Sequence, residues 1–466
     1  MLIINPATGE TIRDVAEDTQ ESVRRKFDRL KGEQPAWAAK SLAARVNILA
    51  RFSALLDSYR DTLAADLTAE MGKPLVQARN EINGARARIS WMIENAEKFL
   101  TDEIMSEGDR MIEKIVYEPL GIVCNISAWN YPYLVGVNVF VPALIAGNTV
   151  MYKPSEYATV TGMSIERLLK EAGVSDDAFH IAIGGKPTGE LLLDLPFDGY
   201  FFTGSYQTGK YIYERVAPGM VPCQCELGGK DPLYVCDDIT DVKAVAAATA
   251  DGAFYNNGQS CCAVERIYVH EKIYDEYVDA FVNEVKSWKI GNPTESDVYI
   301  GPLARDAQRA VLEAQIQDAV ENGAVVACGG SRIEGKGYYF QPTVLLNVNH
   351  GMRVMREESF GPIIGIMKVH DDEEALWLMQ DTEYGLTASV YSDSEERARR
   401  ILSAIDAGTG YWNCCDRVSA AVPWSGRRHS GIGVTLSHAG LRAFTKPKAY
   451  HLKRSKNSHS NTQTKL

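Results

Sequence analysis

The sequence predicts an α/β protein with a doubly wound parallel sheet in one domain and a second α/β domain after it. Segments of strand and helix character alternate from residue 122 to 226 and again from residue 232 to 406. Repeated strand–helix–strand units of this length are typical of parallel sheets, which bind ligands at the carboxyl ends of their strands. Two further segments, 111–118 and 446–453, have strand character outside both regions.

Each expected element follows from the period of its apolar residues. Before the sheets, 36–70 and 76–100 repeat apolar residues at helical spacing, which predicts amphipathic helices that pack and carry no chemistry. In the first region we expect strands at 122–127, 149–152, 179–183, 199–203 and 221–226, and helices at 133–146, 159–172, 187–194 and 206–216. In the second region we expect strands at 232–236, 264–269, 325–328, 363–369 and 386–391, and helices at 242–254, 273–287, 305–322 and 394–406.

Composition and charge argue against several classes of function and partner. The chain has 466 residues and a formal net charge of -12, which argues against nucleic acid or an anionic membrane as a partner. The start lacks the basic region of a secretory signal, and the longest apolar run, 133–147, is interrupted by Asn138 and Pro142 and is too short to span a bilayer. We therefore expect a cytoplasmic protein, with a disordered polar tail at 455–466.

Nine cysteines do not form a recognisable disulfide framework or metal site. Their number is odd, and two pairs, 261–262 and 414–415, are adjacent in the chain and cannot easily bridge each other. The pair Cys223 and Cys225 lacks the further ligands of a zinc site. The expectation is reduced thiols and no metal.

One cysteine pair lies in a segment suited to nucleophilic chemistry. A predicted helix ends in the polar loop 255–260, two cysteines follow, and a predicted strand begins at Val264. Backbone N–H groups in such a loop favour a thiolate and can stabilise a developing oxyanion. Spacing alone also fits a buried structural cysteine.

Three segments together resemble the aldehyde dehydrogenase superfamily, in its NAD(P)-dependent, hydrolytic, non-acylating type. They are Gly-Gln-Ser-Cys at 258–261, Glu-Leu-Gly-Gly-Lys at 226–230 and Ala-Trp-Asn-Tyr-Pro at 128–132, and the resemblance extends from residue 5 to 446. It implies that Cys261, and not its neighbour Cys262, is the nucleophile. It also implies that Glu226 is the general base and that Asn130 donates to the oxyanion.

The resemblance also implies where a dinucleotide binds. The carboxylate of Glu156 would accept from the ribose hydroxyls and repel a 2′-phosphate, which favours NAD while leaving NADP possible. Gly204 and Ser205 would receive the pyrophosphate at a helix N-terminus, with Glu358 on the nicotinamide ribose and Phe360 beside the ring. The remaining expected cofactor contacts are Ile126, Trp129, Lys153, Ser155, Gly185 and Leu227.

Other functions remain open on the residues alone. The stretch 204–211 has P-loop spacing after a strand, but Tyr211 stands where a magnesium-ligating Ser or Thr is required. A thiol esterase or thioester hydrolase would need Cys261 and Glu226 and no cofactor. A binding protein that keeps the fold without turnover is a third alternative.

The substrate is the least determined feature. Tyr131, Tyr255 and Trp424 fall where the family lines its aldehyde tunnel, and Arg417 could bind a carboxylate near its mouth. Asn138 stands where some semialdehyde-specific relatives carry an arginine, which counts against a dicarboxylic semialdehyde. Thr435 replaces the second glutamate that many relatives use to move protons.

The expected domain organisation follows from these segments and from the resemblance. An NAD-binding domain would comprise 1–107 and 122–229, and a catalytic domain 230–440. An oligomerisation arm would comprise 108–121 and 441–454, because exposed strand edges invite pairing with another chain. We expect a small-molecule aldehyde as substrate and a homodimer or homotetramer.

Overall fold

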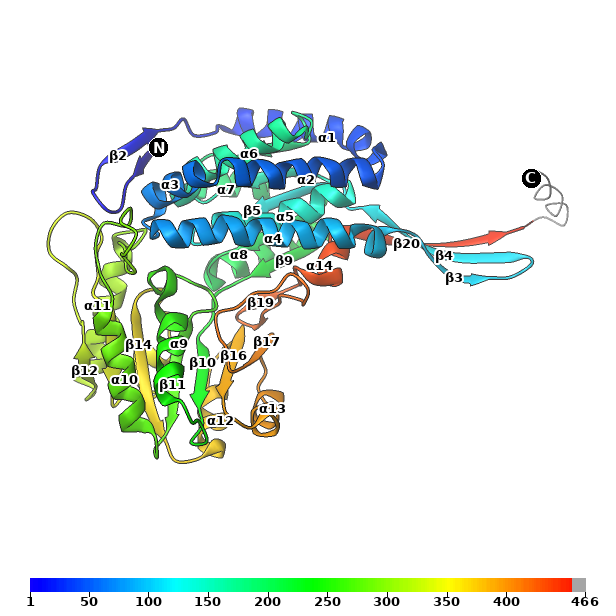
Figure 1. Ribbon diagram of the computed structural model, residues 1–466. Helices are drawn as coiled ribbons and strands as arrows, with labels where there is room; N and C mark the ends of the chain where they lie inside the picture. The colour runs from blue at the N-terminus through cyan, green and yellow to red at the C-terminus, as the bar shows by residue number, and fades with distance from the viewer. Residues whose placement is uncertain (455–466) are drawn as a thin grey trace.

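Three large sheets organise the chain, as a computed structural model that describes residues 1–454 shows (Figure 1). The first sheet lies beneath the N-terminal helices, the second forms the lower domain in this view, and the third extends away from both. The predicted disordered tail, 455–466, lies outside the described residues. No helix within 1–454 is long and apolar enough to cross a membrane.

The first sheet has six strands in the order β19-β9-β8-β5-β6-β7. All neighbours are parallel except β19 and β9. Its strands are β5 (Ile122–Ile126), β6 (Thr149–Lys153), β7 (Phe179–Ile181), β8 (Gly199–Thr203), β9 (Cys223–Glu226) and β19 (Gly431–Ile432). The helices between them are α5 (Pro132–Ala146), α6 (Thr159–Ala172), α7 (Lys186–Leu193) and α8 (Tyr206–Val216). This confirms the predicted doubly wound parallel sheet.

The second sheet has seven strands in the order β12-β13-β14-β11-β10-β16-β17, with only β12 antiparallel to its neighbour. Its strands are β10 (Asp231–Val235), β11 (Val264–His270), β12 (Val325–Cys328), β13 (Thr343–Leu346), β14 (Ile363–Val369), β16 (Thr387–Tyr391) and β17 (Thr409–Trp412). Its helices are α9 (Val242–Phe254), α10 (Tyr274–Ser287), α11 (Ala307–Glu321), α12 (Asp372–Gln380) and α13 (Glu395–Ser403). We did not predict β13 and β17, which have four residues each.

The third sheet is an antiparallel arm in the order β20-β4-β3. Its strands are β3 (Glu103–Glu107), β4 (Met111–Pro119) and β20 (Thr445–Lys453), and β20 pairs with β4 along its whole length. The sequence assigned residues up to 107 to the first domain, but β3 pairs with β4 and so belongs to this sheet. The arm therefore begins at Glu103, earlier than expected.

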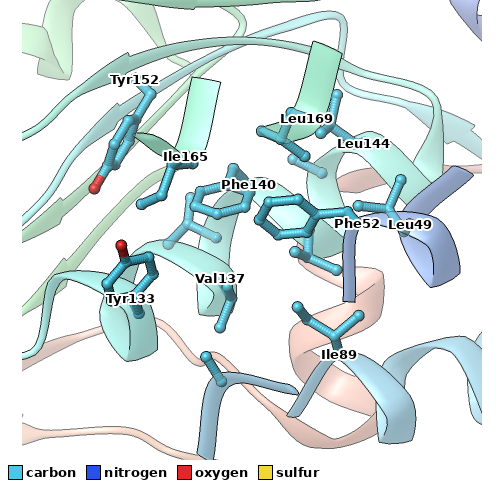
Figure 2. Packing of buried hydrophobic residues seen from close by; sticks show 14 of the residues in the cluster. Leu49, Phe52, Ile89, Tyr133, Val137, Phe140, Leu144, Tyr152, Ile165 and Leu169 are labelled. Atoms are coloured by element: carbon cyan, nitrogen blue, oxygen red, sulfur yellow. The ribbon is translucent and has the colours of Figure 1, made fainter. Parts of the chain in front are cut away.

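The N-terminal helices provide the core that holds the first sheet. They are α1 (Gln20–Ala39), α2 (Leu42–Ser58), α3 (Arg60–Met71) and α4 (Leu75–Leu100), preceded by the hairpin β1 (Leu2–Ile4) and β2 (Thr11–Asp14) and joined later by α14 (Ser437–Arg442). Phe52 from α2 and Ile89 from α4 pack against Val137 and Phe140 of α5 (Figure 2). Burial of each such side chain contributes about 1.5–3 kcal/mol to the free energy of folding. The apolar run that contains α5 is thus a buried core helix.

The ends of α5 position the residues before it. Pro132 occupies the first turn, where its fixed φ suits a helix start, and Gly147 ends the helix with a left-handed φ of 100°. The helix is buried on nearly every side, so its start cannot shift without disturbing the core. Asn130 and Tyr131, which precede it, are therefore held in a fixed place.

Candidate active site

A cavity of about 820 Å³ joins the strand ends of the first sheet to the loop before β11. Its lining includes Cys261, Glu226 and Asn130. It also includes every predicted cofactor contact: Ile126, Trp129, Lys153, Ser155, Glu156, Gly185, Gly204, Ser205, Leu227, Glu358 and Phe360. Residues far apart in the sequence, each chosen for its motif, thus face one space.

The loop that carries Cys261 is buried and locked in an unusual backbone conformation. Asn256 and Asn257 have φ of 55° and 57°, a left-handed region that asparagine tolerates better than most residues. Gly258 follows at φ 68°, and a Cβ there would lie 2.4 Å from the Gly361 carbonyl oxygen. The Gln77 Oε1 accepts from the Asn256 N–H at 2.9 Å. The thiol is therefore presented by a loop with little freedom.

The two adjacent thiols have different surroundings. Cys261 is partly exposed and lines the cavity. Cys262 is buried, and its Sγ lies 3.0 Å from Asp416 Oδ1. A hydrogen bond with Cys261, and after it burial, raises the pKa of Cys262 well above its usual range. Cys262 is therefore held as a neutral thiol away from the cavity.

Asn130 is fixed on both its backbone and its side chain. The ammonium of Lys73 donates to the Asn130 carbonyl at 2.8 Å, and Asn256 Nδ2 donates to the same oxygen at 3.1 Å. The Asn130 Nδ2 donates to the Gln259 carbonyl at 3.1 Å. This amide donor therefore lies next to the loop that carries the thiol.

Glu226 ends β9 inside the cavity, and its surroundings favour the neutral acid. Burial raises the pKa of Glu226 to about 7, while a hydrogen bond from the Thr435 hydroxyl and the charge of Arg88 act in the opposite direction. A carboxyl group with a pKa near neutrality can both take and release a proton at physiological pH. Thr435 thus contacts this carboxylate directly.

One end of the cavity has the donors and acceptors that a dinucleotide requires. Lys153 is buried, and its ammonium has only the Pro154 carbonyl, at 3.3 Å, as a hydrogen-bond acceptor among residues 1–454. The carboxylate of Glu156 lies beside it in the same wall. Ser205 precedes α8 without capping it by a side-chain hydrogen bond, so the first N–H groups of that helix can donate to an anion. These residues fit ribose hydroxyls and a pyrophosphate.

Two aromatic rings line the same cavity as the thiol. Phe360 has a φ of 48°, and its ring lies 5.4 Å from that of Trp129, edge to face. Burial raises the pKa of Glu358 to about 8, and the Gly229 N–H donates to it at 3.1 Å. A flat, partly apolar ring would fit between these groups.

The four predicted substrate residues do not line this cavity. Tyr131 packs under Lys73, whose ammonium lies 3.8 Å from the ring centre, and Tyr255 accepts from Asn80 at 3.2 Å. Trp424 is buried and pairs with Thr435 through their backbones. Arg417 is exposed, and its carbonyl accepts from the Tyr411 hydroxyl. Their role in a substrate path remains a prediction.

Two arginines near the cavity were not predicted. Arg305 lines it and stacks 5.8 Å from the ring centre of Trp129, with Gln308 accepting from it at 2.7 Å. Arg88 is buried on α4, and its charge acts on Glu226. Only one signal in the sequence pointed to Arg88, namely a charged residue beside the apolar Ile89 on the packing face of a helix.

The alternative P-loop interpretation fails at Tyr211, where a magnesium-ligating Ser or Thr is required. Tyr211 lines the cavity, and its hydroxyl donates to Glu190 at 2.7 Å. It cannot replace the hydroxyl that ligates magnesium in such loops.

A cavity at parallel strand ends that holds a thiol, a buried carboxyl group and the donors and acceptors of a dinucleotide site has the features of an NAD(P)-dependent oxidoreductase. A family model described as the aldehyde dehydrogenase family matches residues 1–450. The chain belongs to this family, and it is an enzyme that oxidises aldehydes with NAD or NADP.

Relatives that are named for different substrates have similar sequence identity to this chain. A chloroplastic betaine aldehyde dehydrogenase of Amaranthus hypochondriacus is 35% identical, over 95% of this chain and 90% of the relative. A succinate-semialdehyde dehydrogenase [NADP(+)] of Deinococcus radiodurans is 32% identical, over 96% and 93%. The betaine aldehyde dehydrogenase of Staphylococcus aureus, solved in complex with NAD+, superposes with a TM-score of 0.93 at 29% identity, over 99% of this chain and 93% of that one.

Proposed function

We propose that the chain oxidises aldehydes to carboxylic acids through a thioester on Cys261. The observation that supports this most directly is that Cys261, Asn130 and Glu226 line one cavity together with the expected cofactor contacts. A cofactor-independent thiol hydrolase would have no use for the Lys153 and Glu156 end of that space. We infer the role of each residue from this arrangement.

The residues divide the reaction between them. The Cys261 thiolate adds to the aldehyde carbon, and the oxyanion that forms is stabilised by the Asn130 side-chain amide and the Cys261 backbone N–H. A bound nicotinamide supplies the hydride acceptor for this chemistry. Glu226 then takes a proton from water as the water attacks the thioester, and the acid leaves as Cys261 is regenerated.

Cofactor choice, assembly and location are also proposals. The Glu156 carboxylate disfavours a 2′-phosphate, which supports NAD over NADP. The edge strands of the arm support a homodimer or a homotetramer, with β20 next to a partner's sheet. The acidic net charge and the reduced cysteines support a cytoplasmic enzyme.

The test is reduction of NAD or NADP, followed at 340 nm, with a panel of aldehydes. We expect NADH formation with a lower KM for NAD than for NADP, loss of turnover in Cys261→Ala, and most of the turnover kept in Cys262→Ala. An inactive Cys262→Ala with an active Cys261→Ala would overturn the assignment of the nucleophile. A lower KM for NADP would mean that Glu156 does not contact the ribose.

A further inference from the structure

Arg88, a buried arginine near the reaction centre, has hydrogen-bond donors that no residue within 1–454 uses. Arg88 is 9% exposed, and its Nη1 donates to the Leu134 carbonyl at 3.2 Å and to Asn138 Oδ1 at 2.9 Å. Within residues 1–454 no carboxylate forms an ion pair with it. Its Nε and Nη2 have no hydrogen-bond partner among these residues, yet the protein does not enclose either atom completely. Both nitrogens are thus partly accessible, although Arg88 is not among the residues that line the 820 Å³ cavity.

The fold places the Arg88 guanidinium near the reacting atoms. On the same face of α4, Glu81 accepts from the Tyr133 N–H at 2.9 Å, so this face packs on the segment that begins with Asn130. Arg88 lies two turns further along α4 and contacts α5 at Leu134 and Asn138. Burial lowers the pKa of Arg88, and Glu226, Cys262, Cys261 and Glu81 are the groups that oppose this shift.

Leaving a guanidinium buried without an anion is unfavourable, because it loses hydration and gains no partner. The planar fork of arginine matches a carboxylate through two parallel hydrogen bonds. An anionic group of a ligand beside Nε and Nη2 would supply the missing partner.

We propose that Arg88 binds the carboxylate of the substrate, so that the chain oxidises aldehydes that carry an acid group at their far end. This inference rests on the proposed function and specifies its substrate class.

With Arg88 in this role, Asn138 no longer argues against a substrate that carries a carboxylate. An asparagine at that position counted against a dicarboxylic semialdehyde, because some relatives have an arginine there. In this chain the arginine comes from α4 instead, and Asn138 Oδ1 orients it. The exposed Arg417 is not needed for this role.

Neighbouring carboxyl groups do not favour a cationic substrate over an anionic one. Glu81 is paired with Lys73 in the core. Asp416 accepts from Ser260 and Cys262, both at 3.0 Å, and burial raises its pKa toward the neutral acid. Both acidic groups thus already have partners, whereas the Nε and Nη2 of Arg88 have none within residues 1–454.

The wild-type enzyme gives the first test. We would compare kcat/KM for 4-oxobutanoate, 5-oxopentanoate and 6-oxohexanoate with kcat/KM for their methyl esters and for 4-aminobutanal, using NAD. We expect at least one acid to exceed its own ester by tenfold or more. Equal values for each acid and its ester, or preference for the aminoaldehyde, would overturn the role of Arg88. Absence of NADH with every aldehyde would instead contradict the proposed function.

Variants on α4 separate recognition from packing. In Arg88→Gln we expect the acid-to-ester ratio of kcat/KM to fall to about one, mainly through KM for the acid, and in Arg88→Lys to recover partly. The control is Arg86→Gln, whose side chain pairs with Asp57 on the other side of the helix and should leave the ratio unchanged. An equal loss for acid and ester in Arg88→Gln would show a structural role only.

Discussion

At the scale of single residues, the site depends on the different environments of two adjacent cysteines. Cys261 faces the cavity, whereas Cys262 turns to Asp416 and is kept as a thiol. Glu226 is likewise set apart from ordinary surface glutamates, because burial brings its pKa to about 7. The environment of each group, rather than its type, decides which chemistry it can perform.

The Thr435 hydroxyl donates to the Glu226 carboxylate, so a variant can test its effect on the base. A donor to a carboxylate favours the charged form and lowers its pKa, so Thr435→Val should raise the pKa of Glu226. Because the base must be deprotonated, we expect the acid limb of the kcat–pH profile to move upward by about one pH unit. The control is Thr240→Val, whose hydroxyl contacts Asp393 at the surface. An unmoved limb would show that Thr435 does not tune the base.

At the scale of elements, most motif residues could be predicted because they follow strands or precede helices. The end of β9, the loop before β11 and the start of α5 are recognisable from turn residues and apolar period. Arg88 could not be assigned in this way. Apolar period marks its side of α4 as a packing face, and only the structure shows that its Nε and Nη2 have no hydrogen-bond partner within residues 1–454.

The pair of Lys73 and Glu81 links α4 to the reactive segment. Both side chains are fully buried, and Lys73 also donates to the Asn130 carbonyl. Lys73→Met leaves a buried carboxylate without its partner, so we expect the free energy of unfolding to fall by about 3–5 kcal/mol. Urea-induced unfolding of the variant and the wild type measures this difference in free energy. Lys272→Met, which removes a partner of Asp237 at the surface, should change it by less than about 1 kcal/mol. Equal losses in the two variants would contradict this view of the pair.

At the scale of the molecule, the two parallel sheets could be predicted and several of their short strands could not. Regular alternation of strand and helix fixes a parallel sheet and its binding edge. The strands β13, β17 and β3 have only four or five residues each, so each gives a weak alternating pattern, and they were not predicted although each pairs with a neighbouring strand along the chain.

The arm provides a test at this scale. β20 covers one edge of β4, and its removal would expose that edge, so a chain that lacks 446–466 should be monomeric or poorly soluble. A chain that lacks only 455–466 keeps β20 and should assemble like the full chain, which we expect to be a dimer or tetramer. Light scattering measures both, and a monomeric full-length protein would contradict the proposed assembly.

The most direct measurement of the central claim is the mass of the acyl-enzyme. Glu226→Gln keeps the carboxylate's shape but cannot take a proton from water, so the thioester should form and persist. After mixing with NAD and an aldehyde, intact-mass analysis should show one acyl group per chain, and peptide mapping should place it on Cys261. An acyl group on Cys262, or steady turnover equal to that of the wild type with no adduct, would contradict the account.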